Sequence, residues 1–309
     1  MKPFPIKTVI IVCGPTAVGK TSAAILLAKH FHTEIISADS RQCYKELKIG
    51  VARPSDKELN SVTHHFIASH SVTENINAAC FAQYALKKIN ELFLKYDLVV
   101  MVGGTGLYIR AFTEGLDSIP DIDPSIRKQI IADYESKGLQ WLQDEVRTKD
   151  PLFFAVGETQ NPQRMMRALE VAESTGRSII DFRRSEKTNR DFNICKIGLD
   201  LPKEELHDNI NTRVDNMMEE GLVGEVSSLM SYRHVNALQT VGYAEIFEHL
   251  DGKISLHAAI EDIKKHTRQY AKRQLTWFRK DKEIHWINAK QSDDLIAMAQ
   301  KLVSATEKR

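Results

Sequence analysis

The chain has 309 residues, which is enough for one large or two ordinary domains with a buried core. Apolar residues make up 42%, as in soluble globular proteins, and the net charge of +1 argues neither for nor against a nucleic-acid partner. No apolar stretch approaches the roughly 20 residues of a membrane span, and residues 1–7 lack the apolar region of a signal peptide. The four cysteines lack zinc-ligand spacing, so we expect reduced thiols in a cytoplasmic protein.

Short apolar runs alternate with helical patterns in the first third of the chain. β-branched runs at 8–13, 34–38 and 98–102 predict buried strands, and the spacing of Ala and Leu predicts helices at 21–31 and 78–92. This alternation is typical of βαβ units, which form parallel sheets.

The pattern changes between residues 120 and 190, where the sequence is helical and charged and contains no convincing strand. Strand character returns at 194–201, long helices are expected at 206–230 and 256–279, and a last short strand at 283–288. We therefore predict a first part of an α/β core at 1–119, a helical insertion at 120–190, and a second part of the core at 191–309 that carries a basic C-terminal helix.

A phosphate-binding loop follows the first predicted strand. Its pattern G-x-x-x-x-G-K-[ST] is matched by Gly14, Pro15, Thr16, Ala17, Val18, Gly19, Lys20 and Thr21. Backbone N–H groups and a helix N-terminus attract an anion there, Lys20 adds a positive charge, and the Thr21 hydroxyl can bind Mg²⁺. The motif is typical of nucleotide- and ATP-binding proteins, so we expect a P-loop NTPase-like parallel sheet flanked by helices and a ligand that bears a diphosphate.

An acidic residue is missing where a nucleotide hydrolase needs one. The third predicted strand runs into Gly103-Gly104-Thr105-Gly106, whereas Asp39 ends the second strand. Because the carboxyl ends of parallel strands face the ligand, we expect Asp39 and Thr105 to face whatever Lys20 holds. A lone carboxylate beside a diphosphate suits a proton acceptor for an incoming nucleophile. The alternatives for Asp39 are a cap for the next helix and a partner of the metal.

Two further features have a structural and a functional interpretation. One face of the last long helix carries Lys265, Arg268, Lys272 and Arg279. This basic face either contacts the phosphates of RNA or is an ordinary solvated face beside aromatic side chains of the core. The residues alone favour the solvated face. The adjacent His64 and His65 show no acidic partner pattern, so we expect loop packing or hydrogen bonding rather than zinc binding.

Further motifs follow the phosphate loop in order along nearly the whole chain: Asp39-Ser40 with Tyr44, Ile49-Gly50-Val51-Ala52-Arg53-Pro54, His64-His65-Phe66-Ile67, Gly103-Gly104-Thr105-Gly106-Leu107-Tyr108, Glu114-Gly115-Leu116, Asn161-Pro162-Gln163-Arg164, Arg167-Ala168-Leu169-Glu170, Val241-Gly242-Tyr243, and Lys272-Arg273-Gln274-Leu275-Thr276-Trp277-Phe278-Arg279. Their order resembles the bacterial tRNA dimethylallyltransferases, the IPP transferase family.

The resemblance implies a prenyl transfer that needs Mg²⁺. The exocyclic amine of adenosine 37, immediately 3′ of the tRNA anticodon, would attack dimethylallyl diphosphate, giving isopentenyladenosine and releasing diphosphate. Asp39 would be the general base. Lys20, Thr21, Thr105 and Arg213 would complete the catalytic set, with Thr16 also on the diphosphate. The same resemblance implies a cytoplasmic monomer that binds neither membrane nor DNA.

The resemblance also implies contacts to the anticodon stem-loop, which the insertion would clamp from one side. The implied tRNA-binding residues are Asp39, Ser40, Arg41, Gln42, Thr105, Arg127, Gln163, Arg164, Met165, Met166, Arg167, Gln239, Thr240, Val241, Gly242, Tyr243, Ala244, Lys272, Arg273, Gln274, Leu275, Thr276, Trp277, Phe278 and Arg279.

Three alternatives remain. An adenylate isopentenyltransferase acting on free AMP shares the chemistry but needs neither the insertion nor the basic helix. A small-molecule kinase would need the acid that is missing after Val102. A non-enzymatic nucleotide-binding RNA module would not need Asp39.

Overall fold

The computed structural model describes residues 7–117, 119–183 and 188–306. The chain divides into two compact units, one formed by Met1–Thr113 with Asn189–Arg309 and the other by Glu114–Thr188. We call them the core unit and the insertion unit. The sequence places the insertion at 120–190, so the two sets of boundaries differ by a few residues.

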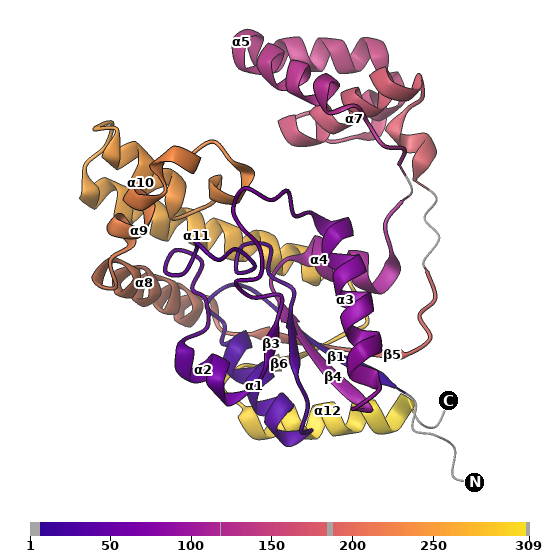
Figure 1. The fold of residues 1–309 in the computed structure, drawn as a ribbon, viewed down its shortest axis with the longest axis vertical. Helices are drawn as coiled ribbons and strands as arrows, with labels where there is room; N and C mark the ends of the chain where they lie inside the picture. The colour runs from indigo at the N-terminus through magenta and orange to yellow at the C-terminus, as the bar shows by residue number, and fades with distance from the viewer. Residues whose placement is uncertain (1–6, 118, 184–187, 307–309) are drawn as a thin grey trace. The chain divides into compact units, whose positions relative to one another are not determined.

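The core unit is built on a six-stranded parallel sheet of order β3-β2-β4-β1-β5-β6 (Figure 1). The strands are β1 (Thr8–Cys13), β2 (Ile35–Ser37), β3 (His64–His65), β4 (Leu98–Gly103), β5 (Asn193–Asp200) and β6 (Ile284–Asn288). The five strands expected from the sequence are all present, and the predicted α/β class is confirmed. β1 lies between β4 and β5 and is buried along its whole length.

Alternate residues of β1 enter two different hydrophobic cores, as the period of two in a strand requires. Ile10 and Val12 pack in a core with helices α1 (Lys20–His30) and α12 (Ser292–Thr306), which lie side by side in Figure 1. Val9 and Ile11 pack in the other core, with α3 (Ala78–Phe93), α4 (Gly106–Glu114), α10 (Tyr243–Leu250) and α11 (Leu256–Phe278). Helices therefore cover both faces of the sheet.

The single long helix expected at 206–230 is wrong. Helix α8 (Lys203–Glu219) ends before Gly221, whose φ of 98° is in the left-handed region, and a short helix α9 (Leu222–Ser228) follows. Glycine adopts this conformation without the strain that a Cβ would bring, so the chain turns there. The short helix α2 (Asp56–Ser61) lies in a segment for which the sequence predicted no element.

The described residues of the insertion unit form helices joined by turns and loops, and no strand. It contains α5 (Pro124–Lys149), which is interrupted at Gly138, and the shorter α6 (Pro151–Val156) and α7 (Pro162–Thr175). Its own hydrophobic core includes Leu142, Phe153 and Leu169, which are almost fully buried. The prediction of a segment with helices and no strand is therefore confirmed for this part of the chain.

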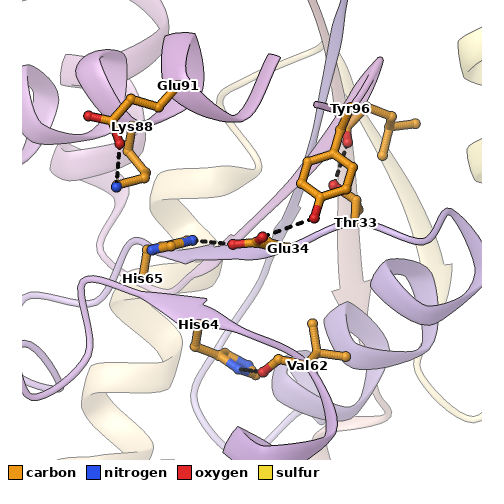
Figure 2. A network of polar contacts seen from close by, with 9 residues as sticks. Thr33, Glu34, Val62, His64, His65, Lys88, Glu91 and Tyr96 are labelled. Atoms are coloured by element: carbon orange, nitrogen blue, oxygen red, sulfur yellow. Dashed lines mark hydrogen bonds and ion pairs between the residues drawn. The ribbon is translucent and has the colours of Figure 1, made fainter. Parts of the chain in front are cut away.

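His64 and His65 form the edge strand β3 rather than a loop. Parallel pairing with β2 brings Glu34 beside them, and His65 Nε2 lies 2.6 Å from Glu34 Oε2 (Figure 2). The Tyr96 hydroxyl donates to the other oxygen of Glu34 at 3.0 Å. The hydrogen bonding expected of the two histidines is therefore present, and the acidic partner of His65 lies 31 residues away in the sequence. No group of three potential metal-binding side chains exists among the described residues.

Candidate active site

A cavity of about 220 Å³ opens at the carboxyl ends of β1, β2 and β4. The phosphate loop forms one wall of it, and the side chains of Lys20 and Thr21 line it. Its other lining residues are Thr16, Ala17, Gly19, Ser22, Ser37, Asp39, Gln42, Val51, Ala52, Arg53, Pro54, Glu58, Val102, Gly103, Arg213, Tyr270 and Gln274. The strand-loop-helix context that the motif requires is present.

Not every residue of the loop faces this cavity. Gly14, Pro15 and Val18 are buried and do not line it, and Val18 packs in the core beneath α1. The Lys20 ammonium donates to the Pro15 carbonyl at 2.6 Å. These three residues therefore shape the loop, while the half-buried Thr16, Lys20 and Thr21 present polar groups to a ligand.

Helix α8 holds the phosphate loop from the side. Asn209 and Arg213 are four residues apart and so share one helical face. Asn209 Nδ2 donates to the Ala17 carbonyl at 3.2 Å, and Arg213 Nη1 donates to Thr16 Oγ1 at 3.2 Å. The sequence analysis missed Asn209, although its helical spacing from Arg213 is a signal that would have found it.

Gln274 bridges two loops of the site and is almost fully buried. Its Oε1 accepts the Thr16 N–H at 2.8 Å, and its Nε2 donates to the Gly104 carbonyl at 2.9 Å. The predicted contact of this side chain with tRNA therefore does not fit its surroundings, since both ends of the amide are bound inside the protein. Tyr270, which lines the cavity one helical turn earlier in α11, was also missed.

Asp39 has one oxygen engaged in the protein. Its Oδ1 accepts the N–H groups of Arg41 at 2.9 Å and Gln42 at 3.1 Å, so this oxygen orders a turn. The alternative of a cap for the next helix is wrong, because that helix begins at Asp56 and is capped by Ser55. Its Oδ2 makes no hydrogen bond with any described residue, and the side chain lines the cavity together with Lys20 and Arg213. One carboxylate oxygen orders the turn and the other is available to a ligand.

The cavity carries an excess of positive charge. Burial lowers the pKa of Lys20 to about 8, the neighbouring Arg213 charge also lowers it, and Asp39 opposes both. Burial likewise lowers the pKa of Arg213, again opposed by Asp39. The lining holds three cations, Lys20, Arg53 and Arg213, against the two carboxylates of Asp39 and Glu58. An anion that binds between Lys20 and Arg213 would stabilise both of these charges.

Thr105 does not line this cavity, contrary to the expectation that it faces the ligand of Lys20. Its hydroxyl accepts the Ser40 N–H at 3.1 Å and donates to the Ser40 hydroxyl at 3.3 Å. Because Ser40 directly follows Asp39, Thr105 orders the residue beside the carboxylate instead. Of the predicted catalytic set, Asp39, Lys20, Thr21 and Arg213 share the cavity.

The segments of the core unit that are predicted to bind RNA expose only some of their side chains. The exposed residues are Gln239, Ala244, Lys272, Arg273, Thr276 and Arg279. The half-buried ones are Arg41, Gln42, Thr240, Val241, Leu275 and Trp277, and the buried ones are Gly242, Tyr243 and Phe278. The buried side chains are packed in the core, so contact with RNA falls to the exposed ones. On the basic face of α11, Lys265 is exposed, while Arg268 donates to Asn211 at 2.7 Å.

The insertion unit shows the same division. Gln163 and Arg164 are exposed on α7, whereas Met165 and Met166 are buried in the unit's core and do not fit the predicted RNA contact. Arg127 and Arg167 are partly exposed, and each donates to one oxygen of the buried Glu170, at 2.8 and 3.0 Å.

Known proteins are similar to this chain in sequence. Residues 42–281 match the model of the family described as IPP transferase. The chain is 44% identical to tRNA dimethylallyltransferase 1 of Bacteroides thetaiotaomicron, with 94% of each chain covered, and 48% identical to the tRNA dimethylallyltransferase of Christiangramia forsetii, with 90% of this chain and 92% of that protein covered.

Solved structures are similar as well. The tRNA isopentenylpyrophosphate transferase of Bacillus halodurans is 34% identical with a TM-score of 0.72, and 98% of each chain is covered. A eukaryotic dimethylallyltransferase acting on tRNA is 26% identical with a TM-score of 0.74, covering 92% of this chain and 74% of that one. The match of the family model and these relatives show that the chain belongs to the IPP transferase family.

Proposed function

We propose that this protein transfers a dimethylallyl group from dimethylallyl diphosphate to the exocyclic amine of adenosine 37 in tRNA. The observation that carries the proposal is the cavity in which the free oxygen of Asp39 faces the same space as Lys20 and Arg213. A diphosphate neutralises the two cations, and the carboxylate remains to accept a proton. Its relatives' activity supports the same reaction.

The chemistry follows from this arrangement. The adenine amine attacks the allylic carbon, a C–N bond forms, and the C–O bond to the diphosphate breaks. Negative charge then grows on the departing diphosphate, where Lys20, Arg213 and the backbone N–H groups of the phosphate loop stabilise it. The amine proton passes to Asp39, an assistance typically worth on the order of 10²–10⁴ in rate.

The site also fits magnesium. Thr21 places a hydroxyl on the cavity that would hold the diphosphate. Mg²⁺ is usually bound by one or two protein oxygens together with substrate phosphates and water, so the Thr21 hydroxyl would hold the ion while Asp39 stays free to accept the proton. When bound, the ion would offset charge on the diphosphate.

The RNA side of the proposal rests on exposed cations. The exposed side chains of Lys272 and Arg273 on α11 and of Arg164 on α7 suit contacts with RNA phosphates. The adenine of the anticodon loop must leave its base stack to reach the cavity. No helix of the described residues is long and apolar enough to cross a membrane. A cytoplasmic location and a monomeric state belong to the same proposal.

The test is mass spectrometry of tRNA nucleosides after incubation with dimethylallyl diphosphate and Mg²⁺. Isopentenyladenosine should form with the native protein and should be nearly absent with Asp39→Asn. Parallel reactions with AMP and with ATP plus small metabolites distinguish the alternatives. Transfer to AMP alone, or phosphorylation without prenyl transfer, would overturn the proposal.

A further inference from the structure

A loop at residues 48–54 forms the wall of the cavity opposite the phosphate loop. Val51, Ala52, Arg53 and Pro54 line the cavity from this loop. The loop is neither helix nor strand, and its own backbone supplies only two turn hydrogen bonds, Ala52 N–H to Ile49 and Arg53 N–H to Lys48. Its shape therefore depends on partners outside it.

Glu225 on α9 supplies those partners. Its Oε2 accepts the N–H groups of Lys48 at 3.0 Å and Ile49 at 2.8 Å, and its Oε1 accepts the N–H of Gly50 at 3.0 Å. The Tyr243 hydroxyl donates to the same Oε1 at 2.5 Å. An ionised carboxylate has about four acceptor positions, so this single side chain is saturated by four donors.

The other side of the loop is held by Gln42. Its Nε2 donates to the carbonyls of Val51 at 3.2 Å and Ala52 at 2.9 Å, and its own N–H donates to Asp39. The hydrogen bonds therefore run without interruption from the loop to the carboxylate of the active site. Glu225 fixes the first half of the loop and Gln42 the second.

The loop packs closely against the ring of Tyr243 at Gly50. A Cβ at Gly50 would lie 2.5 Å from the ring of Tyr243, so the loop passes directly over a fully buried aromatic side chain. Burial and the adjacent Glu225 raise the pKa of Tyr243, which keeps its hydroxyl protonated as a donor. The structure thereby gives Tyr243 a place inside the protein, although the resemblance implies contact with tRNA.

We propose that Glu225 is a positioning residue that holds the 48–54 wall of the active-site cavity in its binding shape through Tyr243 and three consecutive backbone N–H groups. It does not line the cavity, so it acts through the loop and not on the substrate. The inference rests on the proposed function only for the identity of the donor, dimethylallyl diphosphate.

The four hydrogen-bond partners of Glu225 show which substitution is most informative. All four are donors, so the amide NH₂ of Glu225→Gln must meet at least one N–H or O–H and leave it without an acceptor. Glu225→Asp keeps the charge but is shorter by one methylene, and should recover part of the function. Tyr243→Phe removes one donor of four and keeps the ring. Glu220→Gln, on an exposed residue just before α9, is the matched control.

The first readout is amide hydrogen exchange, which does not depend on the reaction. Glu225→Gln should speed exchange at Lys48, Ile49 and Gly50 by at least about tenfold while β1 and β4 keep their protection. Unchanged exchange at these amides would overturn the inference, because Glu225 would then not hold the loop. An equal rise in exchange throughout the chain would also overturn it, because Glu225 would then contribute only to the stability of the whole protein.

The second readout is kcat/KM for dimethylallyl diphosphate at saturating tRNA. Glu225→Gln should lower it about 10- to 100-fold, Glu225→Asp and Tyr243→Phe by less, and Glu220→Gln by less than about twofold. Equal values for the Gln variant and the control would overturn the inference. A native protein that transfers no dimethylallyl group would instead overturn the proposed function, and the exchange result would still decide the role of Glu225.

Discussion

The carboxylates that order the loops around the cavity of the core unit and the carboxylate beside the surface arginines of the insertion unit are used in opposite ways. In the core unit, Asp39 and Glu225 accept backbone N–H groups and thereby order the loops around the cavity. In the insertion unit, the buried Glu170 accepts two partly exposed arginine side chains and orders no loop. Fixed backbone suits a small anion that must be held for chemistry, whereas arginines held at a surface suit the phosphates of a large RNA.

This difference predicts two kinds of defect. Changes to the carboxylate-ordered loops around the cavity of the core unit should affect the chemical step or the binding of the prenyl donor. Changes in the insertion unit should affect the binding of tRNA in a salt-dependent way and leave the chemical step alone. Each experiment below can break that division or make it sharper.

The largest effect is expected for Asp39→Asn. The amide oxygen can still accept the N–H groups of Arg41 and Gln42, so the turn should persist, but the side chain can no longer take a proton. We expect the single-turnover rate to fall on the order of 10²–10⁴-fold, with the Kd of the donor changed by less than about threefold. A rate within tenfold of the native protein would show that Asp39 only caps the turn.

The charge of Lys20 gives the second prediction. A lysine is charged below its pKa, and burial places the pKa of Lys20 at about 8, so the free protein should lose this charge as the pH rises above 8. Between pH 8 and 9, kcat/KM for the donor should therefore fall about fivefold, and between pH 9 and 10 about tenfold more, to a total of about 50-fold. Measurement at saturating donor should show a weaker fall, since a bound diphosphate raises the same pKa.

Lys20→Met is the control for this profile. It should lower kcat/KM at pH 7 and remove the decline above pH 8, because the titrating group is gone. A decline that persists in the variant would assign it to another group.

The features that could be predicted best from the sequence are those set by the backbone conformation of a few neighbouring residues. The strand before Gly14, the helix after Lys20 and the carboxylate at the end of β2 all follow from patterns within a few residues. The break at Gly221 was missed because the helical periodicity continues on both sides of it, and periodicity reports which face is buried rather than whether the helix is continuous.

Contacts between distant segments were beyond reach. Gln274 and Tyr243 lie in segments that a resemblance marks for RNA, yet their partners Thr16 and Glu225 are 258 and 18 residues away. Nothing in a local pattern shows which side of a helix is closed off by a neighbouring loop. Helical spacing does separate the exposed Arg273 from the buried Gln274 and Phe278 once the inward face of α11 is known.

The third prediction concerns the bridge made by Gln274. Gln274→Leu fills a similar volume but leaves the Thr16 N–H and the Gly104 carbonyl without their partner. Loss of one neutral hydrogen bond typically costs about 1 kcal/mol, so we expect KM for the donor to rise about 10-fold and KM for tRNA to change by less than about twofold. A rise in KM for tRNA alone would support the predicted contact of Gln274 with RNA. It would also contradict the proposed difference between the two units.

The smallest effect is expected in the insertion unit. Glu170→Gln keeps the shape of a side chain that is only 1% exposed but removes the charge that Arg127 and Arg167 share. The two guanidinium groups should then lose their fixed positions, and KM for tRNA should rise about 3- to 5-fold, with a shallower dependence on salt concentration. The rate at saturating tRNA and the KM for the donor should not change.

Glu173→Gln on the same helix is the matched control, since its carboxylate pairs with Lys149 at the surface and a pair of this kind contributes little. It should leave KM for tRNA within about 1.5-fold of the native value. If Glu170→Gln instead slowed single-turnover transfer at saturating tRNA, the insertion unit would take part in the chemical step. Glu170 would then not act only by holding arginines for RNA binding, and the contrast with the carboxylates that order loops for chemistry would be wrong.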